Sequence, residues 1–194
     1  GNAVADACGK LRDSILKIGA HQLGCQVEEV AFDGKKVYRL NTKADAVNEI
    51  SLVDISTASM VNNYYETQFT STVSSPVSPP PYMVGMAEIE VDLETGNIEL
   101  LNYEATVDCG TVVNPNLARV QTEGGIVQGI GMALYEDVTY TDRGMIAENS
   151  FMQYKIPTRQ DVGRIHVEFE ASYEPTNPFG AKSIGEVVIN TPSP

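Results

Sequence analysis

Glu186 is the side chain of this sequence whose type and setting best suit a general base. It is the only acid between Pro175 and the C-terminus, it follows Gly185, and it precedes the aliphatic run 187–189. A carboxylate in apolar surroundings has a raised pKa and accepts a proton readily. Lone acids also occur as surface residues or helix caps, so the isolated pattern leaves both interpretations open.

Residues 114–135 predict a helix that is rich in glycine. Asn114 before Pro115 is typical of a helix start, and an apolar face is expected from Val120, Val127, Ile130 and Leu134. The segment nevertheless holds four glycines, and each costs about 1 kcal/mol relative to alanine in a helix interior. A sequence that carries this cost gains something from the missing side chains.

The amides Gln121 and Gln128 lie nearly in line on this helix, because seven residues complete almost two turns. Gly124, Gly125 and Gly131 occupy the neighbouring three- and four-residue offsets, which leaves a bare strip of backbone edged by two amides. An amide offers donors and an acceptor, so the strip suits a polar heterocycle or a phosphate. Close packing against another helix or a sheet is the alternative that the spacing leaves open.

Signals for a metal site or a nucleophile are weak elsewhere. The two histidines, His21 and His166, are far apart, and His166 is expected to be a solvated strand residue. A histidine-based metal site or triad is therefore not expected. Cys109 is expected to be a packed thiol. Three widely spaced cysteines indicate reduced thiols in the cytoplasm, and they are too few to hold a Cys₄ iron–sulfur cluster.

The elements that position these residues begin with an amphipathic helix over residues 3–18, on which apolar residues recur at helical spacing. Residues 27–32 and 36–40 are expected to form a hairpin around an Asp-Gly turn. Ser51, with Asp54 three residues later, resembles a capping box that opens a second helix.

Further along, alternating apolar and polar residues predict strands over 87–91 and 98–107, joined by a turn, and over 165–173. Helices and strands that follow one another in this way indicate an α+β fold with mixed or antiparallel sheets and packed helices.

Residues 67–82 are rich in Ser, Thr and Pro, so they cannot continue a helix or a central strand. Such a segment is either a surface linker or a loop that contacts a ligand. We place the boundary between two halves of the chain here, and expect an N-terminal half over 1–81 and a C-terminal half over 82–194.

The composition excludes several classes of function. The chain has 194 residues, 42% of them hydrophobic, and 26 acidic against 13 basic side chains give a net charge of -13. This length is enough to bury a core. A strong negative field repels phosphate backbones and anionic lipid, so neither nucleic acid nor a membrane surface is an expected partner. The longest uncharged stretch, 67–87, is too polar to span a membrane, and no signal peptide is expected.

Two segments, QTEGGIVQGIG at 121–131 and GAKSIGE at 180–186, resemble the molybdenum-cofactor subunit of the xanthine dehydrogenase and aldehyde oxidase family. The resemblance extends over essentially the whole chain, and the ordered set is specific although each motif is short. The other segments in the family's order are GNAV at 1–4, TST at 70–72, VDCG at 107–110 with NP at 114–115, and YKIP at 154–157. The resemblance implies a hydroxylase that oxidises an electron-poor carbon, with a purine such as xanthine or hypoxanthine favoured.

By this resemblance, Glu186 matches the active-site base and Gln128 matches a glutamine that contacts the pterin. Gly1 and Asn2, with Ala3 beside them, match a pair that cradles the phosphate end of the cofactor, where a helix N-terminus favours negative charge. No side chain is expected to ligate the metal. The remaining cofactor-contacting positions are Ser71, Thr72, Val73, Gly124, Gly125 and Ser183.

The resemblance also implies a molybdenum–molybdopterin cofactor in a dinucleotide form, with iron–sulfur clusters and FAD elsewhere in the complete enzyme. The implied partners are a purine or aldehyde-type small molecule, the remainder of the large subunit, iron–sulfur and flavin subunits or domains, and further copies in an oligomer. Two departures stand out: Val187 replaces the proline that usually follows the glutamate, and the substrate-gripping residues of the longer subunit are not found.

We therefore expect a C-terminal piece of a cytoplasmic subunit that is inactive by itself. Two alternatives stay open. One is a noncatalytic cofactor-binding or assembly module of the same fold, in which protein fills the glycine strip. The other is a relative that acts on aldehydes, nicotinate or carbon monoxide.

Overall fold

A computed structural model describes residues 1–42, 44, 46–62, 66–75 and 77–193. The chain divides into two compact units, Gly1–Pro76 and Val77–Pro194, so residues 77–81 group with the second unit and not with the first half as we expected. Each unit combines helices with a three-stranded sheet. The fold class is α+β, as predicted.

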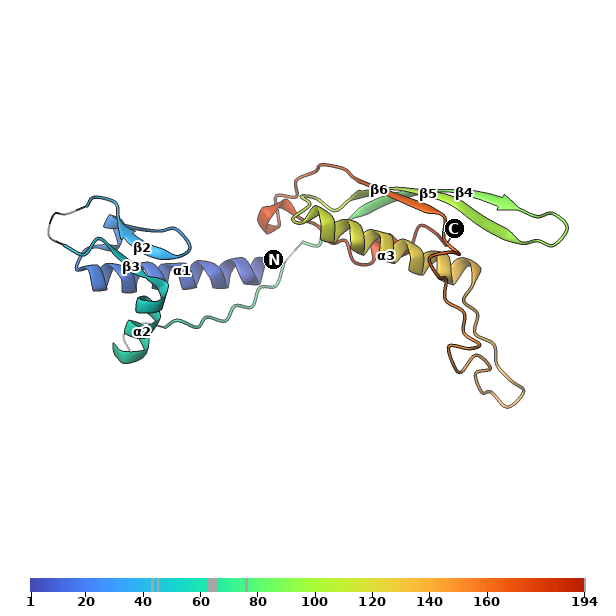
Figure 1. Ribbon diagram of the computed structural model, residues 1–194, viewed down its shortest axis with the longest axis horizontal. Helices are drawn as coiled ribbons and strands as arrows, with labels where there is room; N and C mark the ends of the chain where they lie inside the picture. Colours follow the sequence, from blue (N-terminus) through green and yellow to red (C-terminus); the bar gives the residue numbers. More distant parts are fainter. Residues whose placement is uncertain (43, 45, 63–65, 76, 194) are drawn as a thin grey trace. The chain divides into compact units, whose positions relative to one another are not determined.

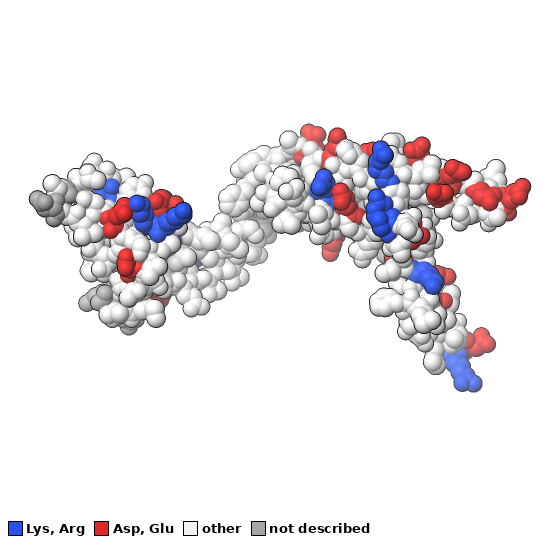
Figure 2. Space-filling model, viewed as in Figure 1, with Lys and Arg blue, Asp and Glu red and all other residues white. Residues whose placement is uncertain are grey.

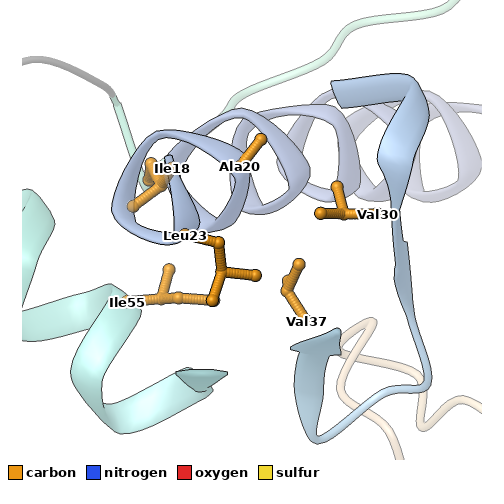
Figure 3. Packing of buried hydrophobic residues seen from close by; sticks show 6 residues of the cluster. All are labelled: Ile18, Ala20, Leu23, Val30, Val37 and Ile55. Carbon is orange, nitrogen blue, oxygen red and sulfur yellow. The ribbon is translucent and has the colours of Figure 1, made fainter. Parts of the chain in front are cut away.

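The first unit packs helix α1 against an antiparallel sheet of order β1-β2-β3 (Figure 1). Its core contains Ile18, Ala20, Leu23, Val30, Val37 and Ile55, which come from α1, the sheet and α2 (Figure 3). The elements are α1 (Asn2–Leu23), the 3₁₀ helix η1 (Val27–Glu29), β1 (Val30–Phe32), β2 (Lys36–Arg39), β3 (Glu49–Ser51) and α2 (Leu52–Asn62).

Local sequence signals act largely as predicted in this unit. The first helix is confirmed and continues to Leu23, where Gly24 in the left-handed region (φ 62°) caps it. The hairpin of β1 and β2 is confirmed, but its first strand begins at Val30, because residues 27–29 form the 3₁₀ helix η1. The predicted capping box forms only in part: Asp54 N donates to Ser51 Oγ at 3.2 Å, as expected, but Asp54 Oδ2 accepts from the Ser51 hydroxyl at 2.6 Å instead of from the Ser51 amide.

In the second unit, helix α3 lies along one face of a sheet of order β4-β5-β6 (Figure 1). Strand β4 runs antiparallel to β5, whereas β6 runs parallel to β5. The elements are β4 (Tyr82–Val91), β5 (Ile98–Asp108), α3 (Pro115–Leu134), β6 (Arg164–Phe169) and the 3₁₀ helices η2 (Pro178–Gly180) and η3 (Val187–Ile189).

The predicted strand over 165–173 is too long. Strand β6 ends at Phe169, which pairs with Val107, and β5 itself ends one residue later at Asp108. The alternating pattern continues to Tyr173, but β5 offers no further residues with which it could pair. Strand β4 begins at Tyr82, five residues before the predicted start. Tyr82 pairs with Asp108, the last residue of β5, so the antiparallel pairing extends over the whole length of β5.

The predicted apolar face of α3 is only partly right. Ile130 is buried, but Val120 and Leu134 are exposed. The helix instead buries a face made largely of small residues, namely Thr122, Gly125, Ile126, Gly129, Ile130 and Gly131. A face that lacks large side chains lets neighbouring segments approach the helix backbone closely.

The acidic side chains gather over the hairpin that joins β4 to β5 (Figure 2). The residues concerned are Glu88, Glu90, Asp92, Glu94 and Glu99. The net negative charge is therefore partly concentrated at one end of the second unit. Within the part of the chain that the structure describes, no helix combines the length and the apolar character needed to cross a membrane.

Candidate functional site

Helix α3 begins at its predicted cap. The side chain of Asn114 accepts a hydrogen bond from Leu117 N at 3.1 Å, and Pro115 occupies the first helical turn. This cap satisfies one of the amide groups that a helix start leaves without a partner. It fixes where the helix begins and therefore which residues face the sheet.

Three of the four glycines of α3 are packed against protein. A Cβ added to Gly125 would lie 2.2 Å from Val188 Cγ2, and one added to Gly129 would lie 2.6 Å from the carbonyl oxygen of Ile189. At Gly131, it would lie 2.9 Å from Pro157 Cδ. The packing interpretation of the glycine strip therefore holds at these three positions.

Gly124 is different, because an added Cβ would meet no heavy atom within 4 Å. Gly124 is exposed, as are Gln121 and Gln128. It lines a groove of about 540 Å³ between α3 and residues 159–165, whose walls include Glu123, Val127 and Arg159. The bare backbone edged by two amides is thus present, but it is narrower than the sequence predicts.

Glu186 is exposed and lies directly before the 3₁₀ helix η3. Its side chain makes no hydrogen bond or ion pair with the residues that the structure describes. Behind it, Val188 is completely buried and packs beside Val107 and Cys109. The predicted apolar surroundings therefore enclose Val188 and not Glu186, because the aliphatic run turns inward after the carboxylate.

The segment that carries Glu186 is tied to the end of β5 by a partly buried ion pair. Lys182 Nζ donates to Asp108 Oδ2 at 2.5 Å, and the two side chains are only 10% and 23% exposed. Ser172 Oγ and the amide of Gly110 donate to Asp108 Oδ1 at 2.5 and 3.0 Å. Lys182 and then Ser172 lower the pKa of Asp108 to about 2.

This shift makes a prediction about stability in acid. Because the pKa of Asp108 is lower in the folded chain than its ordinary value of 3.8, its ionised form stabilises the fold above that value, and this contribution is lost as the pH falls from 3.8 towards 2. In acid titrations followed by circular dichroism, Asp108→Asn should be less stable than wild type at pH 6 and should lose less stability below pH 4. Parallel titration curves for the two proteins would contradict the prediction.

Two glycines let this connection form. Gly110 and Gly180 both have positive φ (69° and 71°), and a Cβ on Gly110 would lie 2.3 Å from the carbonyl oxygen of Gly180. That oxygen accepts a hydrogen bond from Thr111 N at 2.7 Å, and Lys182 N donates to Cys109 O at 2.7 Å. Backbone bonds therefore align residues 180–182 with the end of β5.

In the first unit, the Ser71 loop lies beside the start of α1. Ser71 Oγ donates to Asp6 Oδ2 at 2.6 Å, and Lys10 Nζ lies 2.6 Å from the same oxygen. Hydrogen bonds from Lys10 and Ser71 lower the pKa of Asp6. Two segments that are 65 residues apart in the sequence thus meet at one helix.

The N-terminus of α1 carries the other predicted contacts of this unit. Gly1 is the cap residue and makes no side-chain cap bond, and no acidic residue lies in the first turn. The first amide groups, from Asn2 onward, have no partner within the helix. The structure thus places the segment 1–3 and the loop 71–73 in the same unit, at the same end of α1.

The remaining residues singled out by the sequence have simpler settings. Cys109 is 4% exposed, and burial raises the pKa of its thiol, which suits a packed residue. His166 is exposed on β6, with its Nε2 3.4 Å from Glu168 Oε1. Ser183 is exposed between Lys182 and Glu186. The described part of the chain contains no cluster of three or more His, Cys, Asp or Glu suited to a metal ion.

The fold defines an α+β protein of two compact units. The model of one family, the molybdopterin cofactor-binding domain, matches residues 1–163. The chain therefore belongs to this family, the molybdopterin-binding domains of the xanthine dehydrogenase and aldehyde oxidase type. Residues 180–186 lie beyond the stretch that the family model matches.

Curated relatives extend the comparison. The probable hypoxanthine oxidase XdhD of Escherichia coli (strain K12) is 33% identical over 199 aligned residues, which cover 100% of this chain and 20% of that protein. The abscisic-aldehyde oxidase of Arabidopsis thaliana is 44% identical over 77 residues, 40% of this chain and 6% of that protein. The chain thus spans a fifth or less of the length of these two relatives.

Solved structures agree on the fold. The Cu,Mo-CO dehydrogenase in its carbon monoxide reduced state matches 97% of this chain and 24% of its own, with a TM-score of 0.73 and 22% identity. The quinoline 2-oxidoreductase of Pseudomonas putida 86 matches 94% of this chain and 24% of its own, with a TM-score of 0.70 and 24% identity.

The residues present fit molybdopterin, the cofactor of this family. The open backbone at Gly124 admits a flat group that a side chain would block, and the amides Gln121 and Gln128 beside it offer the donors and acceptors that a pterin ring requires. In the first unit, taken by itself, the uncapped start of α1 offers backbone amides to a phosphate. Because the chain belongs to the molybdopterin cofactor-binding family, its cofactor is molybdenum–molybdopterin.

The motif at 180–186 does not by itself predict that its lysine pairs with Asp108 or that Ser172 joins them. One signal was available: Lys182 is the only Lys or Arg after Arg164. A lone base beside apolar residues suggests a buried pair, because an unpaired buried charge is costly.

Proposed function

We propose that this chain is the molybdopterin-binding portion of a molybdenum hydroxylase in which Glu186 acts as general base. The hydroxylase would oxidise an electron-poor carbon of a small molecule. The observation that carries the proposal is the setting of Glu186: an exposed carboxylate, unpaired among the described residues, on a short segment whose two ends are tied to β5 and α3. A small molecule can therefore reach this carboxylate without breaking any contact of the fold.

Nine further residues would hold the cofactor. Gln128 would contact the pterin through its amide, while Gly124 leaves room for the ring. The start of α1 would hold the phosphate end through backbone amides. These nine are Gly1, Asn2, Ala3, Ser71, Thr72, Val73, Gly124, Gln128 and Ser183. Gly125, which the sequence also predicts as a contact, is instead buried against Val188.

The cofactor, when bound, supplies the centre that takes two electrons from the substrate. Glu186 would remove a proton from the attacking oxygen through one of its Oε atoms, so that the oxygen becomes a better nucleophile. The ion pair of Lys182 and Asp108 would keep the backbone of this segment in place. Iron–sulfur and flavin subunits or domains would take the electrons onward.

A purine is the favoured substrate. The relative that matches the whole chain at 33% identity is named as a probable hypoxanthine oxidase. Aldehydes, nicotinate-type rings and carbon monoxide are the alternatives, because relatives named for an aldehyde, for nicotine and for carbon monoxide also match. A cytoplasmic location and an oligomeric complete enzyme stay predictions.

The proposal is tested on the complete protein, expressed with molybdate in excess. We expect stoichiometric molybdenum by mass spectrometry and dye-coupled oxidation of hypoxanthine or xanthine, and weaker oxidation of aldehydes, nicotinate and carbon monoxide. A molybdenum-free protein would overturn the cofactor assignment. Molybdenum without oxidation of any of these substrates would favour the noncatalytic assembly module instead.

A further inference from the structure

Glu186 has no side-chain contact that fixes its position. Its carboxylate is exposed and makes no hydrogen bond or ion pair with the residues that the structure describes, and both Ser183 and Gly185 in the same stretch are exposed. A catalytic group must nevertheless be held to within a fraction of an ångström. The position of Glu186 must therefore come from the points where its segment is attached.

The attachment on the C-terminal side is hydrophobic. Val188, two residues after Glu186, is completely buried and fills the space left by the missing side chain of Gly125 on α3. Ile189 N donates to Glu186 O at 3.3 Å, which closes the short helix η3. The packing of Val188 against Gly125 therefore holds the C-terminal side of the segment in place.

The attachment on the N-terminal side is ionic, and it joins four parts of the second unit. Asp108 at the end of β5 receives Lys182 Nζ and Ser172 Oγ, each at 2.5 Å. Lys182 Nζ also lies 5.5 Å from the centre of the Tyr82 ring, at the first residue of β4. Because Lys182 is 10% exposed, loss of its partner would leave a buried charge unpaired.

We infer that the ion pair of Asp108 and Lys182 is a positioning device for Glu186, so that these two residues set the rate of the reaction although neither is the base. The inference rests on the proposed role of Glu186. A lysine that only anchored the fold would be needed for stability alone. A lysine four residues before the base, held between the ends of two strands, also determines where the base lies.

The variants that test this inference are Lys182→Met and Asp108→Asn, each close to its parent in shape, in the complete protein. We expect each to lower kcat by about 10- to 100-fold, with KM within about twofold and with unchanged molybdenum content. The double variant should be no slower than the slower single variant, because the two residues act as one unit. Multiplied effects in the double variant would overturn the inference.

A readout that does not need the cofactor is hydrogen exchange in the cofactor-free protein. The amide of Ile189, which donates to Glu186 O, should exchange about tenfold faster or more in Lys182→Met, beyond any uniform rise that the β5 amides show. An equal rise throughout the second unit, or kcat that falls only in step with molybdenum content, would show a merely structural role and overturn the inference.

A matched control is Lys36→Met in the first unit. Lys36 also forms a 2.5 Å pair, with Glu49, but these side chains are 42% and 60% exposed, so its loss should leave kcat unchanged. The outcome separates this inference from the proposed function. If Glu186→Gln is inactive and Lys182→Met has wild-type kcat, only the positioning role fails; if Glu186→Gln is fully active, the proposed function fails first.

Discussion

Replacement of Glu186 by Gln in the complete enzyme is expected to lower kcat by about 100-fold or more, the usual range for loss of a general base. Glutamine keeps the size and shape of the side chain but cannot accept a proton from the attacking oxygen. Because Glu186 is exposed and makes no hydrogen bond or ion pair with the described residues, the substitution removes no contact of the fold. Steady-state oxidation of hypoxanthine, with molybdenum content measured in parallel, gives the result.

The matched control for this experiment is Glu168→Gln. Glu168 is another exposed carboxylate of the second unit, and it lies on β6 beside His166. Glu168→Gln is the same chemical change at a different position, and this variant enzyme should retain the wild-type kcat. A Glu186→Gln enzyme that worked at near wild-type rate would remove Glu186 from the mechanism, whatever the cofactor content.

Local signals predicted most of the secondary structure, because they depend on residues close together in the chain. The cap at Asn114 forms as predicted, and at the start of α2 the Ser51 hydroxyl accepts from the Asp54 amide. These motifs satisfy helix-end amides by themselves and need no help from distant segments. The predicted end of β6 is wrong, because β6 ends where its neighbour β5 ends. The alternation of residues within one strand does not show where a neighbouring strand ends.

In the candidate site, too, the features that depend on nearby residues could be predicted and the contacts between distant segments could not. The residue types at Gln128 and Glu186, and the open backbone at Gly124, follow from the sequence. The connection between Asp108 and Lys182 spans 74 residues, and the contact between Ser71 and Asp6 spans 65. Spacing along the chain cannot predict such pairs. The sequence also could not divide the four glycines of α3 into open and packed positions, because their packing partners, such as Val188 for Gly125 and Pro157 for Gly131, lie in later segments of the chain.

That division of the glycines leads to opposite predictions for two neighbouring positions. Gly124→Ala should stabilise α3 by about 0.5–1 kcal/mol, because alanine is the better helix former and its methyl group meets open space. Gly125→Ala gains the same propensity but forces a methyl group against Val188, which is completely buried. Overpacking of this kind costs about 1–3 kcal/mol, so this variant should be the less stable of the two.

Hydrogen exchange of α3 and η3 amides in the complete protein measures both variants on one scale. Val188→Ala provides the decisive control, since it removes the Cγ2 methyl group that an alanine at position 125 would strike first, while the Cβ of residue 188 stays 3.1 Å away. In that background, Gly125→Ala should be much less destabilising than with Val188. If Gly125→Ala were equally destabilising with Val188 or Ala at position 188, contact with η3 would not be the reason for glycine at this position. The close approach of the Glu186 segment to α3 would then have to depend on Gly129 and the Ile189 backbone instead.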